Sequence, residues 1–394
     1  MKIVLAPDSF KESLTALQVC DAMEQGIRLL DSTIEIIKIP LADGGEGTVA
    51  TLIASTQGTC YNVNVTGPLG EPVEAEYGIT GDGRTAVMEM ASASGLSLVP
   101  LNKRNPSETT TLGTGQLIKH ILDRGIQNII IGIGGSATND CGAGMAQALG
   151  IRFFSDGKPI SDYMCGKRLI NVSSIDFSSL HPHVKKANIQ VACDVDNPLL
   201  GQRGAGRIYA PQKGADAQMV DELEAGMRHF IEILEKQTRP VRDIPGAGAA
   251  GGLGAGLMAF LDATPGSGIN IILDACRFTE KIQAADLILT GEGKIDGQSA
   301  MGKTLAGVLA RATAANVPVI ALAGSIDNDS DIFYEKGLVS MFSICDRPMS
   351  LPQALNQAPE LITKTTERIL RCFTYGIRCA PTTKLTANTK RKFL

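Results

Sequence analysis

Short apolar runs rich in β-branched residues alternate with amphipathic segments along most of this chain. Parallel strands that are buried on both faces by crossover helices produce this pattern, so it predicts an α/β fold. Thr15 and Gln18 predict a capping box for the first helix, and an apolar stripe predicts another helix at 216–236. The expected strands lie at 2–6, 34–40, 128–133, 189–193, 286–290, 317–323 and 338–344.

The alternation is interrupted between Tyr61 and Met90. There, strand-like pieces at 62–66, 73–79 and 85–90 are separated by glycine-containing turns. Such turns join neighbouring antiparallel strands, so this region predicts an antiparallel meander.

The length of 394 residues suits two domains. The simplest organisation places one boundary near the meander and a second near residue 280. The first and last segments then form one discontinuous domain with a parallel sheet, and the middle segment is a second α/β domain inserted into it. The expected parts are a discontinuous α/β domain at 1–75 plus 281–370, an inserted α/β domain at 76–280, and a basic, poorly ordered tail at 371–394.

The charge distribution argues against a nucleic-acid partner. Lys and Arg number 37 against 41 Asp and Glu, for a net charge of −4. Residues 363–394 hold eight of the basic side chains against one glutamate, a local charge of +7 that leaves −11 on the rest. An acidic body offers no electrostatic footprint for nucleic acid, so an anionic substrate must be held by a few local cations and backbone N–H groups.

The sequence predicts a cytoplasmic chain of reduced thiols without a membrane segment. Its nine cysteines include no C-x-x-C pair, and Met1 opens directly into a strand-like run without the blocks of a signal peptide. The longest uncharged stretch, 245–261, is glycine-rich and too short to span a bilayer. If this stretch is a helix, Gly248, Gly252 and Gly256 fall on one face of it. The sequence leaves open whether the chain forms a homo-oligomer.

A glycine-rich loop follows the strand expected at 128–133 and has the sequence GGSATND at 134–140. Without side chains, backbone N–H groups can close on phosphate oxygens, and a following helix adds a favourable dipole. Asp140 at the end of this loop is a candidate metal ligand. A tight turn with helix caps explains each residue singly, but seven such residues together favour a ligand-binding loop.

A second glycine-rich segment begins at Thr290 and contains a G-x-x-x-x-G-K-T match at 297–304. In a P-loop the first glycine leaves the strand directly, whereas here six polar residues follow the apolar run. No later strand is expected to end next to an aspartate that would serve magnesium. A different anion site that uses Lys294 or Lys303 therefore fits better than a P-loop.

Carboxylates at strand ends form the third signal, because phosphoryl transfer to a hydroxyl needs Mg²⁺ ligands and often a base. Asp194 and Asp196 follow the strand expected at 189–193. Side chains two apart in an extended chain point to opposite faces, so one would face a site while the other caps a turn. Asp43 and Asp296 have similar placements, and an Asx turn explains each of them equally well.

The loop APDSFKES at 6–13 directly follows the first strand. Open α/β sheets bind ligands in loops at the carboxyl ends of their strands. Ser9 and Lys11 are therefore candidates for holding a small carboxylate.

Read together and in order, these segments resemble the type 1 glycerate kinase family from Met1 to about residue 370. The phrases that carry the resemblance are KIVLAPDSFKESLTA, PLADGGEGT, TLGTGQLI, GIGGSATND, ACDVDNPLLG, PQKGA, GAGAAGGLGAGL and TGEGKID. The resemblance implies two α/β domains, one inserted in the other, with the catalytic cleft between them. It also implies an ATP-dependent kinase that uses Mg²⁺ to phosphorylate D-glycerate in organic acid catabolism.

The resemblance also suggests roles for individual residues. It places catalysis at Asp194 and Lys294, with Asp194 as the base or the metal-organising carboxylate. It places D-glycerate at Ser9, Lys11, Asp43, Gly44, Gly45 and Glu46. It places the phosphates of ATP at Gly134, Gly135, Ser136, Thr138, Asn139, Gly291 and Gly293.

Three questions stay open at this point. The residues do not say whether the 2- or the 3-hydroxyl of glycerate accepts the phosphoryl group, although the resemblance favours 2-phosphoglycerate as the product. A P-loop ATPase or kinase centred on Lys303 is the alternative enzyme. A ligand-sensing module without catalytic activity is the alternative from another class.

Overall fold

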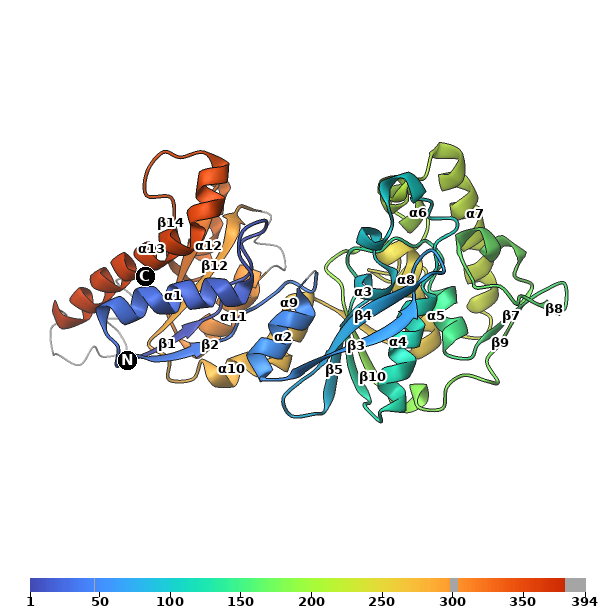
Figure 1. Cartoon of the computed structure of the whole chain (residues 1–394), viewed down its shortest axis with the longest axis horizontal. Helices are drawn as coiled ribbons and strands as arrows, with labels where there is room; N and C mark the ends of the chain where they lie inside the picture. The colour runs from blue at the N-terminus through green and yellow to red at the C-terminus, as the bar shows by residue number, and fades with distance from the viewer. Residues whose placement is uncertain (46, 298–303, 380–394) are drawn as a thin grey trace.

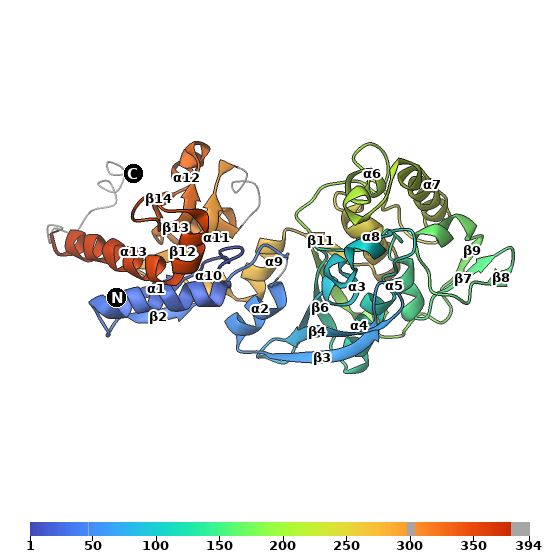
Figure 2. The ribbon, with the colours of Figure 1, turned by 45° about the horizontal axis from the view of Figure 1, so that its top comes forward.

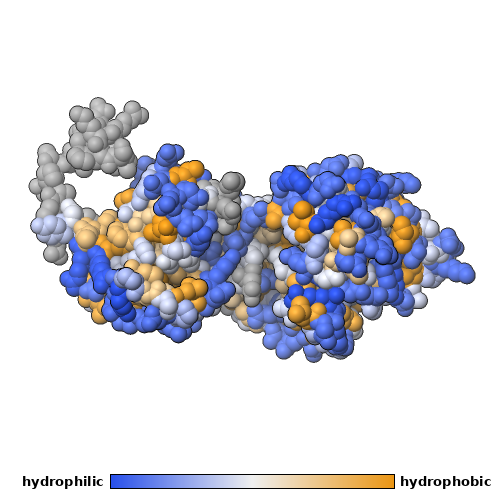
Figure 3. All heavy atoms as spheres, turned by 90° about the horizontal axis from the view of Figure 1, so that it is seen from above, coloured by the Kyte–Doolittle hydropathy of each residue, from blue (hydrophilic) through white to orange (hydrophobic). Residues whose placement is uncertain are grey.

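The computed structural model describes residues 1–45, 47–297 and 304–379. Two lobes lie next to each other along the long axis of the molecule (Figure 1). Each lobe is built around its own sheet, and Figure 3 shows a narrower waist between the two. In the described residues, no helix combines the length and apolar character needed to cross a membrane.

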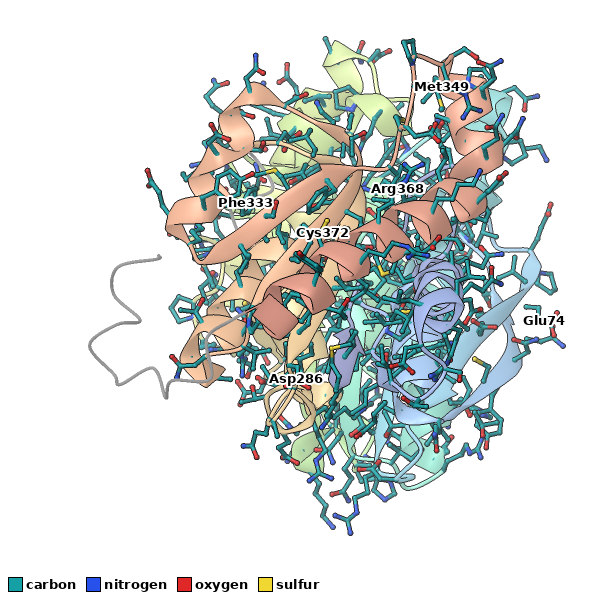
Figure 4. All side chains as sticks on the ribbon, turned by 90° about the vertical axis from the view of Figure 1, so that its left-hand side faces the viewer. Glu74, Asp286, Phe333, Met349, Arg368 and Cys372 are labelled. Atoms are coloured by element: carbon teal, nitrogen blue, oxygen red, sulfur yellow. The ribbon has the colours of Figure 1, made fainter. Side chains whose placement is uncertain are left out.

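The first lobe contains a five-stranded sheet whose neighbouring strands are all parallel, in the order β14-β13-β12-β1-β2. The bounds are β1 (Lys2–Leu5), β2 (Glu35–Lys38), β12 (Leu287–Ile295), β13 (Val319–Ile326) and β14 (Leu338–Ser343). One face of the sheet packs on α1 (Ala16–Leu30) and α13 (Leu351–Cys379). Figure 4 shows α13, with Arg368 and Cys372, crossing this lobe from end to end.

Four helices pack on the other face of the first sheet through one apolar cluster: α2 (Thr48–Thr56), α9 (Gly268–Ala275), α10 (Phe278–Lys281) and α11 (Thr304–Ala315). The short α12 (Ile332–Glu335) precedes β14. The same cluster includes Val87, Ile130 and Ala192 from the second sheet. Helices α2 and α9 therefore lie between the two sheets, as Figure 2 shows, and join the lobes through a common core.

The second lobe contains a six-stranded mixed sheet in the order β11-β10-β6-β5-β4-β3. The bounds are β3 (Thr59–Thr66), β4 (Pro72–Ile79), β5 (Thr85–Glu89), β6 (Asn128–Gly132), β10 (Asn188–Ala192) and β11 (Thr264–Gly266). The helices of this lobe are α3 (Ala91–Ser94), α4 (Leu112–Asp123), α5 (Ala143–Ala148), α6 (Ala205–Tyr209), α7 (Ala217–Leu234) and α8 (Ala249–Leu261). A small antiparallel sheet of β7 (Arg152–Ser155), β8 (Lys158–Pro159) and β9 (Ser174–Asp176) lies at the outer end.

The predicted elements are present. Strands β3, β4 and β5 form the expected antiparallel meander, and the expected parallel strands are all found. Thr15 caps α1 through the predicted box with Gln18, and Asp216 caps α7 by accepting from the Met219 N–H at 2.8 Å. The α/β prediction, with one parallel-sheet domain interrupted by another, is confirmed.

Two sequence-based boundaries differ from those of the sheets. A boundary at 75/76 would cut β4, which pairs over its whole length with β3 and then with β5 in the second sheet. A boundary at 280/281 would separate α9 and α10 from the apolar cluster to which they belong. The chain enters the second sheet at Thr59 and leaves it after Gly266.

Two further expectations need correction. Ala250, Gly251 and Gly252 have left-handed backbone angles that break α8 near its start, so Gly248, Gly252 and Gly256 do not share one helical face. Helix α13 continues to Cys379, so residues 371–379 are helical rather than part of a tail, and residues 380–394 lie outside the described part.

Candidate active site

The loop at residues 40–45 packs between the two lobes at the carboxyl ends of their strands. Gly44 has a φ of +92°, and a Cβ there would come within 2.9 Å of the Ala192 side chain and 3.0 Å of Gly268. A Cβ on Gly132 would meet the Gly44 carbonyl at 2.9 Å. This close packing places Asp43 on the walls of two pockets, one in each lobe.

Pocket 1, of about 590 Å³, lies in the first lobe. Its polar wall contains Ser9, Lys11, Asp43, Gly293 and Lys294, which are five of the predicted site residues. Its apolar wall comes from Phe10 and from the region before and at the start of α13, including Ile344, Met349 and Leu355. The structure therefore unites the predicted glycerate residues Ser9 and Lys11 with part of the predicted nucleotide set.

Asp8 also lines pocket 1 and is absent from the sequence-based set. Its carboxylate accepts from the Thr304 hydroxyl at 2.6 Å and from the Ser9 N–H at 2.6 Å. Burial raises the pKa of Asp8, although these hydrogen bonds oppose the change. The sequence did contain a signal for Asp8, because it is an acidic residue immediately before Ser9 in the loop that follows the first strand.

Lys294 forms ion pairs at the edge of pocket 1. Its Nζ lies 2.8 Å from the Asp327 carboxylate and 3.6 Å from that of Asp296. The hydrogen bond with Asp327 raises the pKa of Lys294. Asp327 directly follows β13, contrary to the expectation that no later strand ends beside an aspartate. The strand runs three residues further than 323, because residues of β12 and β13 pair as far as Ile295 and Ile326.

Pocket 2, of about 470 Å³, lies in the second lobe. It is lined by Asp43, Gly44 and Gly45, by residues 134–136 after β6, and by Asp194 after β10. Gly135 has a φ of +72°, which glycine adopts without strain. Among the residues that the structure describes, none accepts a backbone hydrogen bond from the N–H groups of residues 134–136. This turn can therefore bind an anion through its backbone.

Asp194 and Asp196 have different surroundings, as the alternation of side chains predicts. Asp194 is exposed like Asp196, but it lines pocket 2 and its carboxylate accepts from the Gly268 N–H at 3.0 Å. Burial, with a smaller contribution from Asp43, raises the pKa of Asp194. Asp196 is exposed and pairs with Arg203 at 2.5 Å. Asp194 is therefore the acid that faces the site.

Lys213 completes pocket 2 and was also missed by the sequence-based set. It ends the 3₁₀ helix η5 (Pro211–Lys213), and its side chain is only 2% exposed. Its Nζ donates to the Ser136 hydroxyl and to the Thr138 carbonyl, both at 2.7 Å. The phrase PQKGA, one of those that carry the family resemblance, was the signal that pointed to it.

Other predicted residues lie behind the pockets. Thr138 and Asn139 are fully buried under the turn. Gly291 lies inside β12, where its carbonyl accepts from the Asp8 N–H at 2.8 Å. Glu46 lies outside the described residues.

Asp140 is not placed to hold a metal. It is fully buried, and its carboxylate accepts from the Thr111 N–H and hydroxyl at 2.8 Å each and from the N–H groups of Gly142 and Gly144. These donors occupy its lone pairs and fix the start of α5.

The P-loop alternative fits the structure poorly. Strand β12 ends at Ile295, and a Cβ on Gly297 would meet the Asp329 carboxylate at 2.5 Å. An acidic group beside the first glycine would repel phosphate. Lys303 lies outside the described residues.

Magnesium has suitable donors where the lobes meet. Over residues 1–45, 47–297 and 304–379, no group of three or more His, Cys, Asp or Glu side chains is arranged to hold a metal. Mg²⁺ needs fewer protein ligands than that, because it keeps several waters and binds through one or two carboxylates plus substrate phosphates. Asp43 and Asp194 line the same pocket, and Asp43 adds to the raised pKa of Asp194, so a divalent cation would relieve their repulsion.

The fold and the pockets define a two-lobed α/β protein with polar pockets at the carboxyl ends of its parallel strands. Open α/β sheets bind small ligands at this position.

Comparison with known proteins supplies the family. The model of the glycerate kinase family matches residues 3–374. The chain is 50% identical to glycerate kinase of Bacillus subtilis over 371 residues, which cover 94% of this chain and 97% of that protein. It is 48% identical to glycerate 2-kinase of Escherichia coli over 382 residues, or 96% of this chain and all of that protein.

A solved structure agrees. A crystal structure described as glycerate kinase 2 from Salmonella typhimurium superimposes with a TM-score of 0.88 at 45% identity, and covers 96% of this chain and 99% of that one. This chain belongs to the glycerate kinase family.

Proposed function

We propose that this chain transfers the γ-phosphoryl group of ATP to D-glycerate and forms 2-phosphoglycerate. The observation that carries the proposal is the position of Asp43, on the walls of both pocket 2, which can bind an anion, and pocket 1, which contains Lys11. Lys11 has no ion-pair partner among the residues that the structure describes. Full-length similarity to glycerate kinases, one of them named glycerate 2-kinase, supports the reaction and the acceptor hydroxyl.

The phosphates of ATP bind in pocket 2 at residues 134–136. The free N–H groups of this turn, together with the Ser136 hydroxyl, replace the water that solvates the phosphates. Thr138 and Asn139 support the turn from below rather than touch the nucleotide, because both are fully buried.

Glycerate binds where the two pockets meet. Lys11 is exposed in pocket 1 and, with Ser9, supplies the charge and hydroxyl for the glycerate carboxylate. Lys294 is held by Asp327 in this structure, so we assign it a secondary role at the pocket edge. Residues 43–45 contact both sides and position the acceptor hydroxyl next to the phosphates.

Asp194 accepts the proton of the 2-hydroxyl. A pKa raised by desolvation makes this carboxylate a better base than an aspartate with an ordinary pKa. Mg²⁺ would be held by Asp43 and phosphate oxygens, with Asp194 nearby, and it supplies neutralisation of the phosphate charge. Most of the acceleration then comes from positioning and from the exclusion of water.

The test is ADP formation by the purified chain with Mg²⁺, ATP and D-glycerate, followed by phosphorus NMR of the product. We expect ADP release that depends on D-glycerate and a 2-phosphoglycerate signal. A 3-phosphoglycerate signal would contradict the assigned hydroxyl. ATP turnover that ignores glycerate would favour the ATPase alternative, and binding of both ligands without ADP would favour the sensor.

A further inference from the structure

Lys213 lies directly beneath the turn at residues 134–136. Its side chain is 2% exposed yet belongs to the wall of pocket 2. Two of its three ammonium N–H groups are used, one by the Ser136 hydroxyl and one by the Thr138 carbonyl. The third is left for a ligand in the pocket, as far as the described residues show.

Within the described part of the chain, no carboxylate forms an ion pair with Lys213. Both of its acceptors are neutral groups. Asp140 acts on it through space, but the Asp140 carboxylate is occupied by the donors of Thr111, Gly142 and Gly144. A buried ammonium without a paired carboxylate is costly, and an anion in the adjoining pocket would compensate it.

We propose that Lys213 is the cation that contacts the phosphoryl oxygens of the nucleotide at residues 134–136. This inference deepens the proposed function and rests on it for the identity of the anion. The lysine acts together with the free N–H groups of the turn, and its hydrogen bond to Ser136 orients that hydroxyl so that its own proton points to the phosphate.

Proton uptake accompanies binding. Burial lowers the pKa of Lys213 to about 7, so a large share of the free protein carries a neutral amine at neutral pH. A bound phosphate favours the ammonium, and the amine then takes one proton from solvent. The protonated fraction of Lys213 falls from one half at pH 7 to about one hundredth at pH 9. The affinity for the nucleotide is proportional to this fraction, so it should fall about 50-fold.

Other ionisable groups surround this site and contribute their own pH dependence. Burial raises the pKa of the Cys193 thiol and of the Tyr209 hydroxyl, so both stay neutral through most of this range. Burial also raises the pKa of the Asp140 and Asp194 carboxyls. Their negative charges, when ionised, oppose the binding of an anion. Besides Lys213, the ionisable residues that line the pocket or pack around η5 are Asp43, Arg104, Asp140, Cys193, Asp194 and Tyr209.

The experiment is calorimetric titration of the full chain with Mg²⁺ and ATP, without glycerate, from pH 6.5 to pH 9. In wild type we expect the dissociation constant to rise about 50-fold between pH 7 and pH 9. Lys213→Met should bind about 10- to 100-fold more weakly at pH 7, because a charge-assisted hydrogen bond is lost. Any slope that this variant retains comes from groups other than Lys213. Lys213→Arg keeps a cation that does not titrate and should lose the Lys213 part of the slope.

Matched titrations separate this inference from the proposed function. Lys364→Met removes an exposed charge on α13 and should match wild type at every pH. The dissociation constant of D-glycerate should change less than threefold in Lys213→Met. These titrations measure nucleotide binding without turnover. A chain without kinase activity would therefore refute the proposed function, while the dependence of the ATP dissociation constant on pH would still test the role of Lys213.

Three results would overturn the proposal. One is a wild-type curve that is flat between pH 7 and pH 9, which needs no variant to fold. Another is a folded Lys213→Met variant whose ATP dissociation constant, and whose dependence of that constant on pH, equal those of wild type. The third is a loss of D-glycerate affinity in place of nucleotide affinity.

Discussion

Replacing Asp194 by asparagine tests the proposed base with little change of shape. The Asp194 carboxylate accepts from the Gly268 N–H at 3.0 Å, and an amide oxygen can keep this bond. The variant loses the negative charge and with it the ability to take a proton, so kcat should fall by about 10² to 10⁴, the usual contribution of a general base. Because burial raises the pKa of Asp194, its charge is unfavourable in the folded state, and Asp194→Asn should be at least as stable as wild type.

The assay is glycerate-dependent ADP release at saturating ATP, with KM for ATP measured alongside. Asp196→Asn is the control, since Asp196 is exposed, pairs only with Arg203 among the described residues, and stands two positions away. Its kcat should stay within about twofold of wild type, as expected for a surface substitution. Wild-type kcat should decline as acid protonates Asp194, and the variant should lack this decline. A folded Asp194→Asn enzyme with near-normal kcat would refute the assigned role.

Three other predictions concern packing and charge. A Cβ on Gly268 would overlap the Asp43 carbonyl, so Gly268→Ala should displace this loop and lower kcat by at least tenfold while thermal unfolding stays cooperative. Gly26→Ala places a methyl group against the Thr363 carbonyl of α13, and urea denaturation should show a loss of about 1–3 kcal/mol, despite the better helix propensity of alanine. The folded pKa of Lys213 is depressed to about 7 from 10.5, so its contribution to the free energy of unfolding should rise from pH 7 to pH 10; a pH series in which Lys213→Met shows the same rise would contradict this.

Local patterns in the sequence predicted the central strands and two of the helices but not the assignment of strands to sheets. The strand expected at 62–66 is present as β3, which begins at Thr59, yet nothing local says that it starts the second sheet. The polar residues at 291–294 hide the end of β12, because that part of the strand is held by backbone pairing with β13 and its side chains line pocket 1. This hidden pairing is also what brings Asp327 to Lys294.

The candidate site was predicted where residues directly follow strands and missed where burial decides the chemistry. Ser9 and Asp43 follow strands of the first sheet and Asp194 follows a strand of the second, so the carboxyl ends of strands were enough to select them as candidates. Lys213 has no such marker, since its effect comes from being buried beneath a loop far away in the sequence. The desolvation of the Lys213 ammonium depends on how the chain packs around it, and the spacing of residues in the sequence does not predict this packing.

The apolar contacts of α2 and α9 explain why the site has a defined geometry although it lies between two lobes. Both helices lie next to the candidate site: residues 40–45 precede α2 in the chain, and α9 begins at Gly268, whose N–H binds Asp194. Their apolar side chains pack with Val87, Ile130 and Ala192 of the second sheet as well as with the first. A shared apolar core therefore fixes Asp43 relative to Asp194, so the separation of the proposed base and the proposed metal ligand is set by packing rather than by a flexible linker.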